Sequence, residues 1–377
     1  MDTAQLQEIR SLFPVLNRCV YFNHASNGPL PLTTARVMRE YMERWSSDGE
    51  VPYEECEAMV AEARAAAAQL LRVEPGEIAF TKNTSAGIIV AIGSIAWQAG
   101  DNVILLKDAF PANWYPFQYL LPEVEKRYVT SAELAEGPDC VFRLVDRRTR
   151  AVSLEWVHFL TGIRADILAI AEFCRSLSIY FIIDAIQGLG TIDMDFTRVG
   201  ADFASASTGK WLLGPQGSAL LYVNRKTLPR LRPYNLGWLS GHWEEFNDIF
   251  RVKELKEDAS RFEEGTKNYL GICGVRESLR IILDTGVPAI EARIRSLTDR
   301  LRVGLTRLGY RIVTPEEPER SAGIVTCSKP GDDMTATHKR LTAGKMVCSL
   351  RANCLRIAPH FYNTEDEVDR FLAALAQ

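Results

Sequence analysis

One lysine stands in surroundings that are unusual for a charged side chain. Lys210 lies in SASTGKWLLGPQG, between a run of very small residues and the apolar residues 211–213. Most lysines lie on solvated surfaces, but here the neighbours are tiny or expected to be buried, so the amine is expected in a tight, partly desolvated pocket. Burial disfavours the charged form of an amine and makes it available as a nucleophile. The sequence therefore predicts covalent chemistry at Lys210.

Three other segments carry side chains that suit the same chemistry. IIDAIQG places Asp184 at the carboxyl end of a predicted strand, where it could cap a helix, bind a metal or pair with a protonated ring nitrogen. In FTKNTSAGI, Thr84 and Ser85 open a predicted helix, whose free backbone N–H groups and hydroxyls suit a phosphate; a plain helix cap is the alternative. In DAFPANWYPF, Phe110 follows a strand and could stack on a flat ring.

An imine-forming lysine, an acid for a ring nitrogen, a helix terminus and an aromatic cover together describe a site for pyridoxal 5′-phosphate. Each signal is weak alone, but the combination in this order is specific. A nucleotide-binding Walker A loop is excluded for STGKW, because Ala204 and Trp211 replace a required Gly and a required Ser or Thr. A protein that binds the cofactor without catalysis is the other alternative. It is disfavoured because Lys210 and Asp184 are both present.

The elements that must position these residues alternate between strand and helix from residue 75 onward. The strand candidates are 102–106, 151–154, 180–184, 202–205 and 218–223. Residues 166–177 have helical spacing. Such alternation predicts a mostly parallel sheet covered on both faces, with ligands beyond the carboxyl ends of its strands. Asp184 ends one of these strands, and Lys210 follows another by a few residues.

The pattern of predicted helices and strands changes near residue 275. A long helical pattern covers 288–308, and the strand-like segments GYRIV, SAGIVTC and CLRIA follow. Thr364 and Glu367 form a capping box at the start of a final helix. These elements predict a second, smaller α+β domain, in keeping with a length of 377 residues.

Composition excludes several classes of protein. The net charge is −4 and no block of Lys and Arg occurs, so no nucleic-acid partner is expected. The polar start is not a signal peptide, and the most apolar run, 87–97, falls short of the ~20 residues that span a membrane. It is expected to be a buried helix. The eight cysteines form no C-x-x-C pair, which favours reduced thiols in a cytoplasmic protein and no metal site.

The sequence resembles the class V aminotransferase group of fold-type I pyridoxal-phosphate enzymes, which includes cysteine desulfurases, kynureninases and isopenicillin N epimerase. The likeness runs from YFNHASNGPLP (21–31) to LRIAPHFYNT (355–364). It implies an α/β fold with a large cofactor domain over 21–258, built on a mostly parallel seven-stranded sheet between helices. It also implies a small α+β domain over 259–377, with residues 1–20 packed against that domain.

The resemblance also assigns roles residue by residue. Lys210 would bind the cofactor covalently, Asp184 would bind its ring nitrogen, and Gln187 would lie beside the ring oxygen O3′. The other cofactor-binding residues implied are Thr84, Ser85, Phe110, Asn113 and Ser207. Thr266, in RFEEGTKN, would reach the phosphate of a neighbouring subunit, which implies a homodimer with shared active sites. Arg356 would bind the α-carboxylate of an amino-acid substrate, by a bidentate pairing that lysine cannot reproduce.

Departures from the family pattern limit what the resemblance implies. Only residues 350–353 separate Ser349 from Cys354, so the loop that carries the nucleophilic cysteine of desulfurases is expected to be absent. Cys348 and Cys354 are expected to be strand residues, which argues against a protein persulfide but leaves C–S cleavage open. His158 is either an acid–base group at the substrate or a core histidine, and two further histidines have the same alternatives: His24 and His360. Transamination, elimination and epimerisation all remain open.

Overall fold

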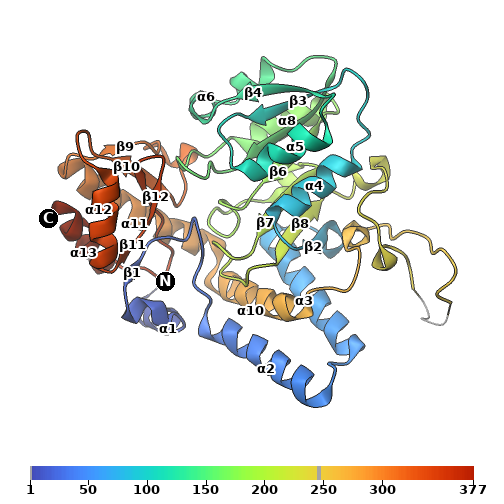
Figure 1. Cartoon of the computed structure of the whole chain (residues 1–377), viewed down its shortest axis with the longest axis horizontal. Coiled ribbons are helices and arrows are strands. Elements are labelled where there is room, and N and C mark those ends of the chain that lie inside the picture. Colours follow the sequence, from blue (N-terminus) through green and yellow to red (C-terminus); the bar gives the residue numbers. More distant parts are fainter. Residues whose placement is uncertain (1, 244–247) are drawn as a thin grey trace.

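The computed structural model describes residues 2–243 and 248–377, and its centre is a seven-stranded sheet (Figure 1). The strand order is β2-β8-β7-β6-β5-β3-β4, and only β8 runs antiparallel to its neighbours. The bounds are β2 (Ile78–Thr81), β3 (Asn102–Leu106), β4 (Glu125–Val129), β5 (Thr149–Glu155), β6 (Tyr180–Asp184), β7 (Phe203–Ser207) and β8 (Ala219–Val223). The predicted mostly parallel sheet is confirmed, and β3 and β6 have the predicted bounds.

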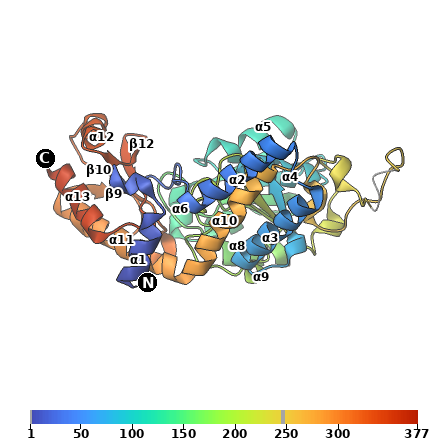
Figure 2. The same cartoon turned by 90° about the horizontal axis from the view of Figure 1, so that it is seen from below.

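Both faces of this sheet are apolar, because alternate residues of each strand point to opposite sides. Ile104 and Leu106 join one buried cluster, whereas Val103 and Leu105 join the other. Helices cover both faces, as Figures 1 and 2 show. Those of the large domain are α2 (Leu32–Asp48), α3 (Tyr53–Leu71), α4 (Thr84–Ser94), α5 (Tyr115–Leu120), α6 (Ser131–Glu136), α7 (Asp139–Phe142), α8 (Ile167–Ser176) and α9 (Phe196–Val199).

Helix α4 is the buried helix predicted for the most apolar segment, although it ends at Ser94 rather than at residue 97. Its residues Ile88, Ala91 and Ile92 are fully or almost fully buried against the sheet. Among the described residues, no helix combines the length and the apolar character that crossing a membrane requires.

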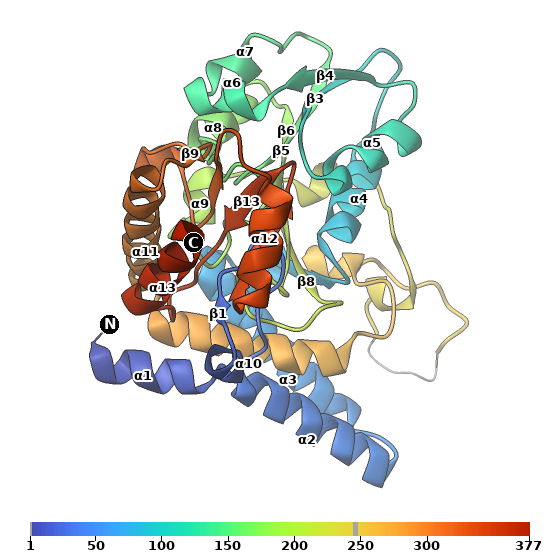
Figure 3. The same cartoon turned by 60° about the vertical axis from the view of Figure 1, so that its left-hand side comes forward.

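A smaller unit follows (Figure 3). Its sheet is antiparallel and has the strand order β12-β13-β10-β9. Its elements are β9 (Arg311–Ile312), β10 (Val325–Ser328), β12 (Ser349–Arg351), β13 (Cys354–Ile357), α11 (Val287–Arg307), α12 (Met334–Ala343) and α13 (Glu365–Ala376). It has its own core, in which Leu301 of α11, Leu355 of β13 and Phe371 of α13 are completely buried. The predicted second α+β unit and the capping box at Thr364 are confirmed.

The N-terminal segment contacts this smaller unit. Arg10 of α1 (Thr3–Ser11) donates to Glu367 at 3.0 Å and to the carbonyl of Tyr362 at 2.7 Å. Strand β1 (Val20–Tyr21) pairs in parallel with β11 (Met346–Val347). Helix α10 (Tyr269–Thr285) packs instead beside α2 and α3 (Figure 2). The domain boundaries at 20/21 and 258/259 stay predictions, and this packing favours a later start for the small domain.

Candidate active site

The carboxyl ends of three neighbouring strands bring the chemically active residues to one edge of the large sheet. Asp184 ends β6, and its register partner on β5 is Glu155, the last residue of that strand. Lys210 lies in the turn that follows β7. Loops beyond the strand ends of a parallel sheet are where ligands bind in this class of fold, so the topology itself assembles the site.

Asp184 is a buried carboxylate held by two hydrogen-bond donors. Only 3 % of its surface is exposed. Asn113 Nδ2 donates to Asp184 Oδ2 at 2.8 Å, and the Ile186 N–H donates to Oδ1 at 3.0 Å. Burial raises the pKa of Asp184, while these two hydrogen bonds and the Lys210 charge oppose the rise. Asn113 comes from a short 3₁₀ turn, Pro111–Asn113, and its Oδ1 is buried without a hydrogen-bond partner in the described part of the chain.

The predicted environment of Lys210 is confirmed. Trp211 and Leu213 are completely buried, and desolvation by burial lowers the pKa of Lys210 to about 8, although Asp184 opposes the change. The Lys210 Nζ lies 5.9 Å from the centre of the Phe110 ring. The N-terminal segment passes directly over this turn, because the Gly28 N–H donates to the Gly209 carbonyl and a Cβ at Gly28 would lie 2.1 Å from the Lys210 oxygen.

The predicted phosphate-binding residues meet at the start of α4. Thr84 is the first residue of the helix, Ser85 is the second, and Asn83 caps it by accepting from the Ala86 N–H at 2.9 Å. Ser207, the last residue of β7, accepts from the Thr84 N–H and donates its own N–H to Thr84 Oγ1, both at 2.9 Å. The hydroxyls of Thr84 and Ser207 therefore lie side by side at the positive end of a buried helix.

Three of the predicted residues lie in the core. His24 and His360 are completely buried, and both nitrogens of each ring have protein partners. Gln187 donates to the Ala25 carbonyl at 3.0 Å and accepts from the Trp211 indole at 2.7 Å. These contacts favour the core alternative for both histidines, and a role of either one at the substrate stays an untested prediction. The role of Gln187 beside a ring oxygen stays a prediction.

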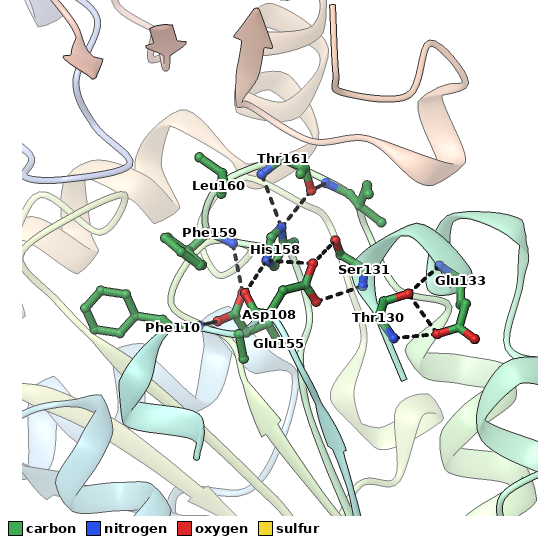
Figure 4. Close-up of polar contacts among 12 residues, drawn as sticks. Asp108, Phe110, Thr130, Ser131, Glu133, Glu155, His158, Phe159, Leu160 and Thr161 are labelled. Carbon is green, nitrogen blue, oxygen red and sulfur yellow. Dashed lines mark hydrogen bonds and ion pairs between the residues drawn. The ribbon is translucent and has the colours of Figure 1, made fainter. Parts of the chain in front are cut away.

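His158 is also held by the protein. Its Nδ1 lies 2.7 Å from Thr161 Oγ1 and accepts from the Thr161 N–H, so the other nitrogen, Nε2, carries the proton and donates to the Asp108 carbonyl at 2.8 Å (Figure 4). Burial lowers its pKa. The geometry favours the neutral core histidine over the acid–base group, and Asp108 in turn is fixed by Ser131.

Arg356 is a buried guanidinium that contacts neutral groups. It lies on β13, where 3 % of its surface is exposed. Nη1 donates to the Phe159 carbonyl at 2.6 Å and Nη2 to Ser26 Oγ at 2.5 Å, while Nε is buried without a hydrogen-bond partner in the described part of the chain. No carboxylate of the described residues lies within ion-pairing distance of it. Burial, followed by the charge of Arg351, lowers the pKa of Arg356 to about 10.

Thr266 and the cysteines complete the set of predicted residues. Thr266 is exposed and lines a cavity of about 290 Å³ together with Lys82 and Ala86, the latter in the first turn of α4. Cys348 is buried, which raises the pKa of its thiol to about 12. Cys354 begins β13, and only a two-residue turn joins β12 to β13.

Comparison with known proteins identifies the family. Residues 20–371 match the sequence model of the Aminotransferase class-V family. The chain belongs to the class V aminotransferase family. It is 27% identical to a probable cysteine desulfurase of Methanothermobacter thermautotrophicus, over 98% of this chain and 96% of the other. It is 28% identical to isopenicillin N epimerase of Streptomyces clavuligerus, over 100% of this chain and 98% of the epimerase. The structure of the cystine C-S lyase C-DES superposes with a TM-score of 0.90 at 23% identity, over 97% of this chain and 99% of that one.

The class V aminotransferase family uses pyridoxal 5′-phosphate, and the polar groups of this chain fit that cofactor. A buried carboxylate suits a protonated ring nitrogen, a lysine amine of lowered pKa suits the aldehyde, and paired hydroxyls at a helix N-terminus suit the phosphate. The partnerless Oδ1 of Asn113 and Nε of Arg356 are buried polar atoms that a bound ligand would satisfy.

Sequence reasoning missed one buried acid of this class V aminotransferase site, Glu155. The strand predicted over 151–154 stopped one residue before it. Glu155 is 3 % exposed and lies between Phe110 and Phe159 (Figure 4). Its position at the end of a strand, as for Asp184, was the available signal. The pairing of β5 with β6 places Glu155 beside Asp184, and the sequence alone does not show that these two strands pair.

Proposed function

We propose that this class V aminotransferase family enzyme binds its cofactor through Lys210 and acts at the α-carbon of an amino acid held by Arg356. The observation that carries the substrate class is the buried guanidinium of Arg356, which has no acidic partner in the described part of the chain and has a partnerless Nε. A buried arginine without a counter-charge is unfavourable, and a substrate α-carboxylate supplies that charge in a bidentate geometry.

Each residue of the site then has one task. When bound, pyridoxal 5′-phosphate withdraws electrons from the α-carbon of an attached amino acid and makes its α-hydrogen acidic. Asp184 holds the proton on the ring nitrogen. Thr84, Ser85 and Ser207 hold the phosphate, and Phe110 covers the ring. Lys210, whose lowered pKa leaves a large neutral fraction near pH 8, carries the α-proton as a general base. Arg356 orients the amino acid.

The step after proton removal defines the reaction, and we propose transamination or elimination. The curated relatives are named as desulfurases and an epimerase, so C–S bond cleavage and epimerisation are the alternatives. For cleavage of a C–S bond, elimination without a protein persulfide is favoured, because Cys348 is buried and the β12–β13 turn is short. A panel of amino acids, incubated with and without a keto-acid acceptor and analysed by mass spectrometry, separates these reactions.

Arg356 variants test the proposal directly. Arg356→Lys keeps a charge and loses the planar fork, whereas Arg356→Ala loses both. We expect both to weaken the turnover of α-amino acids, and the alanine variant to lose about 2–5 kcal/mol in kcat/KM because the pairing is buried.

The control substrates for these variants are the corresponding amines without a carboxylate. Their turnover should change much less than that of the amino acids. An Arg356→Ala protein that melts earlier but keeps its affinity for amino acids would make Arg356 a structural residue and leave the substrate class unsupported.

We also propose a cytoplasmic homodimer in which Thr266 reaches the phosphate bound by the other subunit. The support is that Thr266 is exposed, so that its side chain is accessible to a second copy of the chain. Light scattering on the cofactor-loaded protein measures the mass, and a monomer with full activity would contradict this proposal.

A further inference from the structure

Glu155 is a buried acid to which the proposed cofactor and substrate contacts assign no role. Its carboxylate is buried at the end of β5 and accepts three N–H donors. The Phe110 N–H and Asn113 Nδ2 donate to Oε1 at 2.5 and 3.2 Å, and the Phe159 N–H donates to Oε2 at 2.8 Å. Figure 4 shows the carboxylate between the two phenylalanine backbones.

These contacts connect Glu155 to both halves of the proposed site. On the ring side, the same Asn113 amide that binds Glu155 also binds Asp184. On the substrate side, the Phe159 N–H is held by Glu155, and the Phe159 carbonyl accepts from Arg356 at 2.6 Å. The rings of Phe110 and Phe159 pack edge to face with centres 5.4 Å apart. One buried acid therefore fixes the aromatic cover, the partner of Asp184 and the peptide that contacts Arg356.

We propose, on the basis of the proposed function, that Glu155 is a positioning residue, which in its ionised form holds Phe110, Asn113 and Phe159 in the geometry that binds the cofactor ring. All three of its partners are donors, so both carboxylate oxygens must accept. Protonation would make one oxygen a weaker acceptor and add an O–H that has no acceptor among these partners, which would weaken at least one of these contacts.

The electrostatic surroundings make the ionisation of the Glu155 carboxylate sensitive to pH. Burial, followed by the adjacent Asp184, raises the pKa of Glu155. The charged and titratable groups around it are Asp184 on β6, Lys210 after β7, Asp108 and His158 in the loops after β3 and β5, and Arg356 on β13. A cationic ring nitrogen beside Asp184 would favour the ionised form of Glu155.

The test measures ring binding without covalent chemistry. Pyridoxine 5′-phosphate has the same ring and phosphate but no aldehyde, so its affinity does not depend on imine formation at Lys210. Calorimetric titration of cofactor-free wild-type protein and of Glu155→Gln from pH 6.5 to 9 gives the ratio of the two affinities. The ligand's own titration cancels in this ratio.

We expect the glutamine variant to bind about tenfold more weakly than wild type at pH 9, where the carboxylate is ionised. The difference should shrink toward pH 6.5, because the raised pKa of Glu155 leaves a smaller fraction of wild-type protein with the carboxylate ionised there. Asp202→Asn is the matched control, because Asp202 accepts from the Phe181 N–H at the opposite ends of the strands. Its affinity ratio should stay near one. A Glu155→Gln ratio that does not change with pH, whatever its size, overturns the proposal.

A second variant keeps the test decisive if the glutamine protein does not fold. Glu155→Asp retains a charge with a shorter reach, so it should bind more weakly than wild type and keep the dependence on pH. Loss of that dependence would overturn the proposal. If wild-type protein binds neither pyridoxine 5′-phosphate nor pyridoxal 5′-phosphate, the proposed function fails. If it binds both and the ratio is flat, only the inference about Glu155 fails.

Discussion

At the scale of single residues, opposing effects on Lys210 set its reactivity. Burial and the positive charge of Arg356 favour the neutral amine, and Asp184 and Glu155 favour the ammonium. Burial dominates, and the pKa falls from 10.5 to about 8. An amine in this range is nucleophilic near neutral pH and is still basic enough to accept a proton.

This balance predicts how fast cofactor-free protein takes up pyridoxal 5′-phosphate at different pH. Only the neutral amine attacks the aldehyde, so the rate should rise about tenfold between pH 6 and 7 and level off above pH 8. An amine with the ordinary lysine pKa would keep gaining rate to beyond pH 10.

Uptake can be followed by absorbance, with borohydride reduction and peptide mapping to locate the label. Label on Lys82 or Lys267 would show that the lysine is misassigned. A rate that still rises tenfold per unit above pH 9 would show that the Lys210 environment is not desolvated.

At the scale of elements, the sequence predicted correctly those features that depend only on residues close together in the chain. The bounds of β3 and β6 match because strands buried on both faces are continuous apolar runs between polar residues. Helix α8 covers Ile167–Ser176 within the predicted 166–177, and Asp166 caps it by accepting a local hydrogen bond from the Ala169 N–H. The desolvated surroundings of Lys210 were predicted correctly because its sequence neighbours alone indicate burial.

The features that the sequence did not show depend on packing between segments that lie far apart in the chain. Glu155 gains its role from the register between β5 and β6. The ring of His24 is enclosed by Ala358 and Tyr362, which lie more than three hundred residues away in the chain. Such contacts depend on how distant segments meet, so a motif alone cannot separate a ligand from a core residue.

The β12–β13 hairpin makes a prediction about sulfur chemistry. Ala352 and Asn353 form its two-residue turn with positive φ, and Cys348 before β12 is buried. Neither Cys348 nor Cys354 lies on a long loop that could carry a thiolate to a substrate. Cys348→Ala and Cys354→Ala should therefore keep their turnover within about threefold, since they lose only packing.

Turnover of each cysteine variant should be compared with wild type at equal cofactor loading, and intact-mass analysis should follow incubation with cysteine. A mass increase of one sulfur atom that disappears in one variant, together with its activity, would establish a persulfide enzyme and refute this prediction.

At the scale of the whole molecule, the junction between the two sheets contains buried neutral histidines. His360 follows β13, and its Nε2–H donates to the carbonyl of Trp211, next to Lys210, at 2.9 Å, while Nδ1 accepts from the Phe361 N–H. The rings of His24 and His360 meet with centres 5.0 Å apart. Burial lowers the pKa of His360 to about 4. Protonation would cost a hydrogen bond and place a charge in the core.

This arrangement makes the junction sensitive to acid. The folded pKa of His360 lies below the unfolded value of 6.5, so the unfolded chain takes up the proton first as the pH falls. The contribution of His360 to stability is complete above pH 6.5 and is lost toward pH 4, at about 1.4 kcal/mol per pH unit.

His360→Gln keeps a donor and an acceptor but cannot titrate. Its free energy of unfolding should therefore fall less steeply than that of wild type between pH 6.5 and 4.5, as measured by denaturant unfolding at each pH. Because His242 is exposed, His242→Gln should retain the wild-type slope. Equal slopes for His360→Gln and wild type would mean that His360 is protonated within the folded protein, and that the junction does not depend on its neutral form.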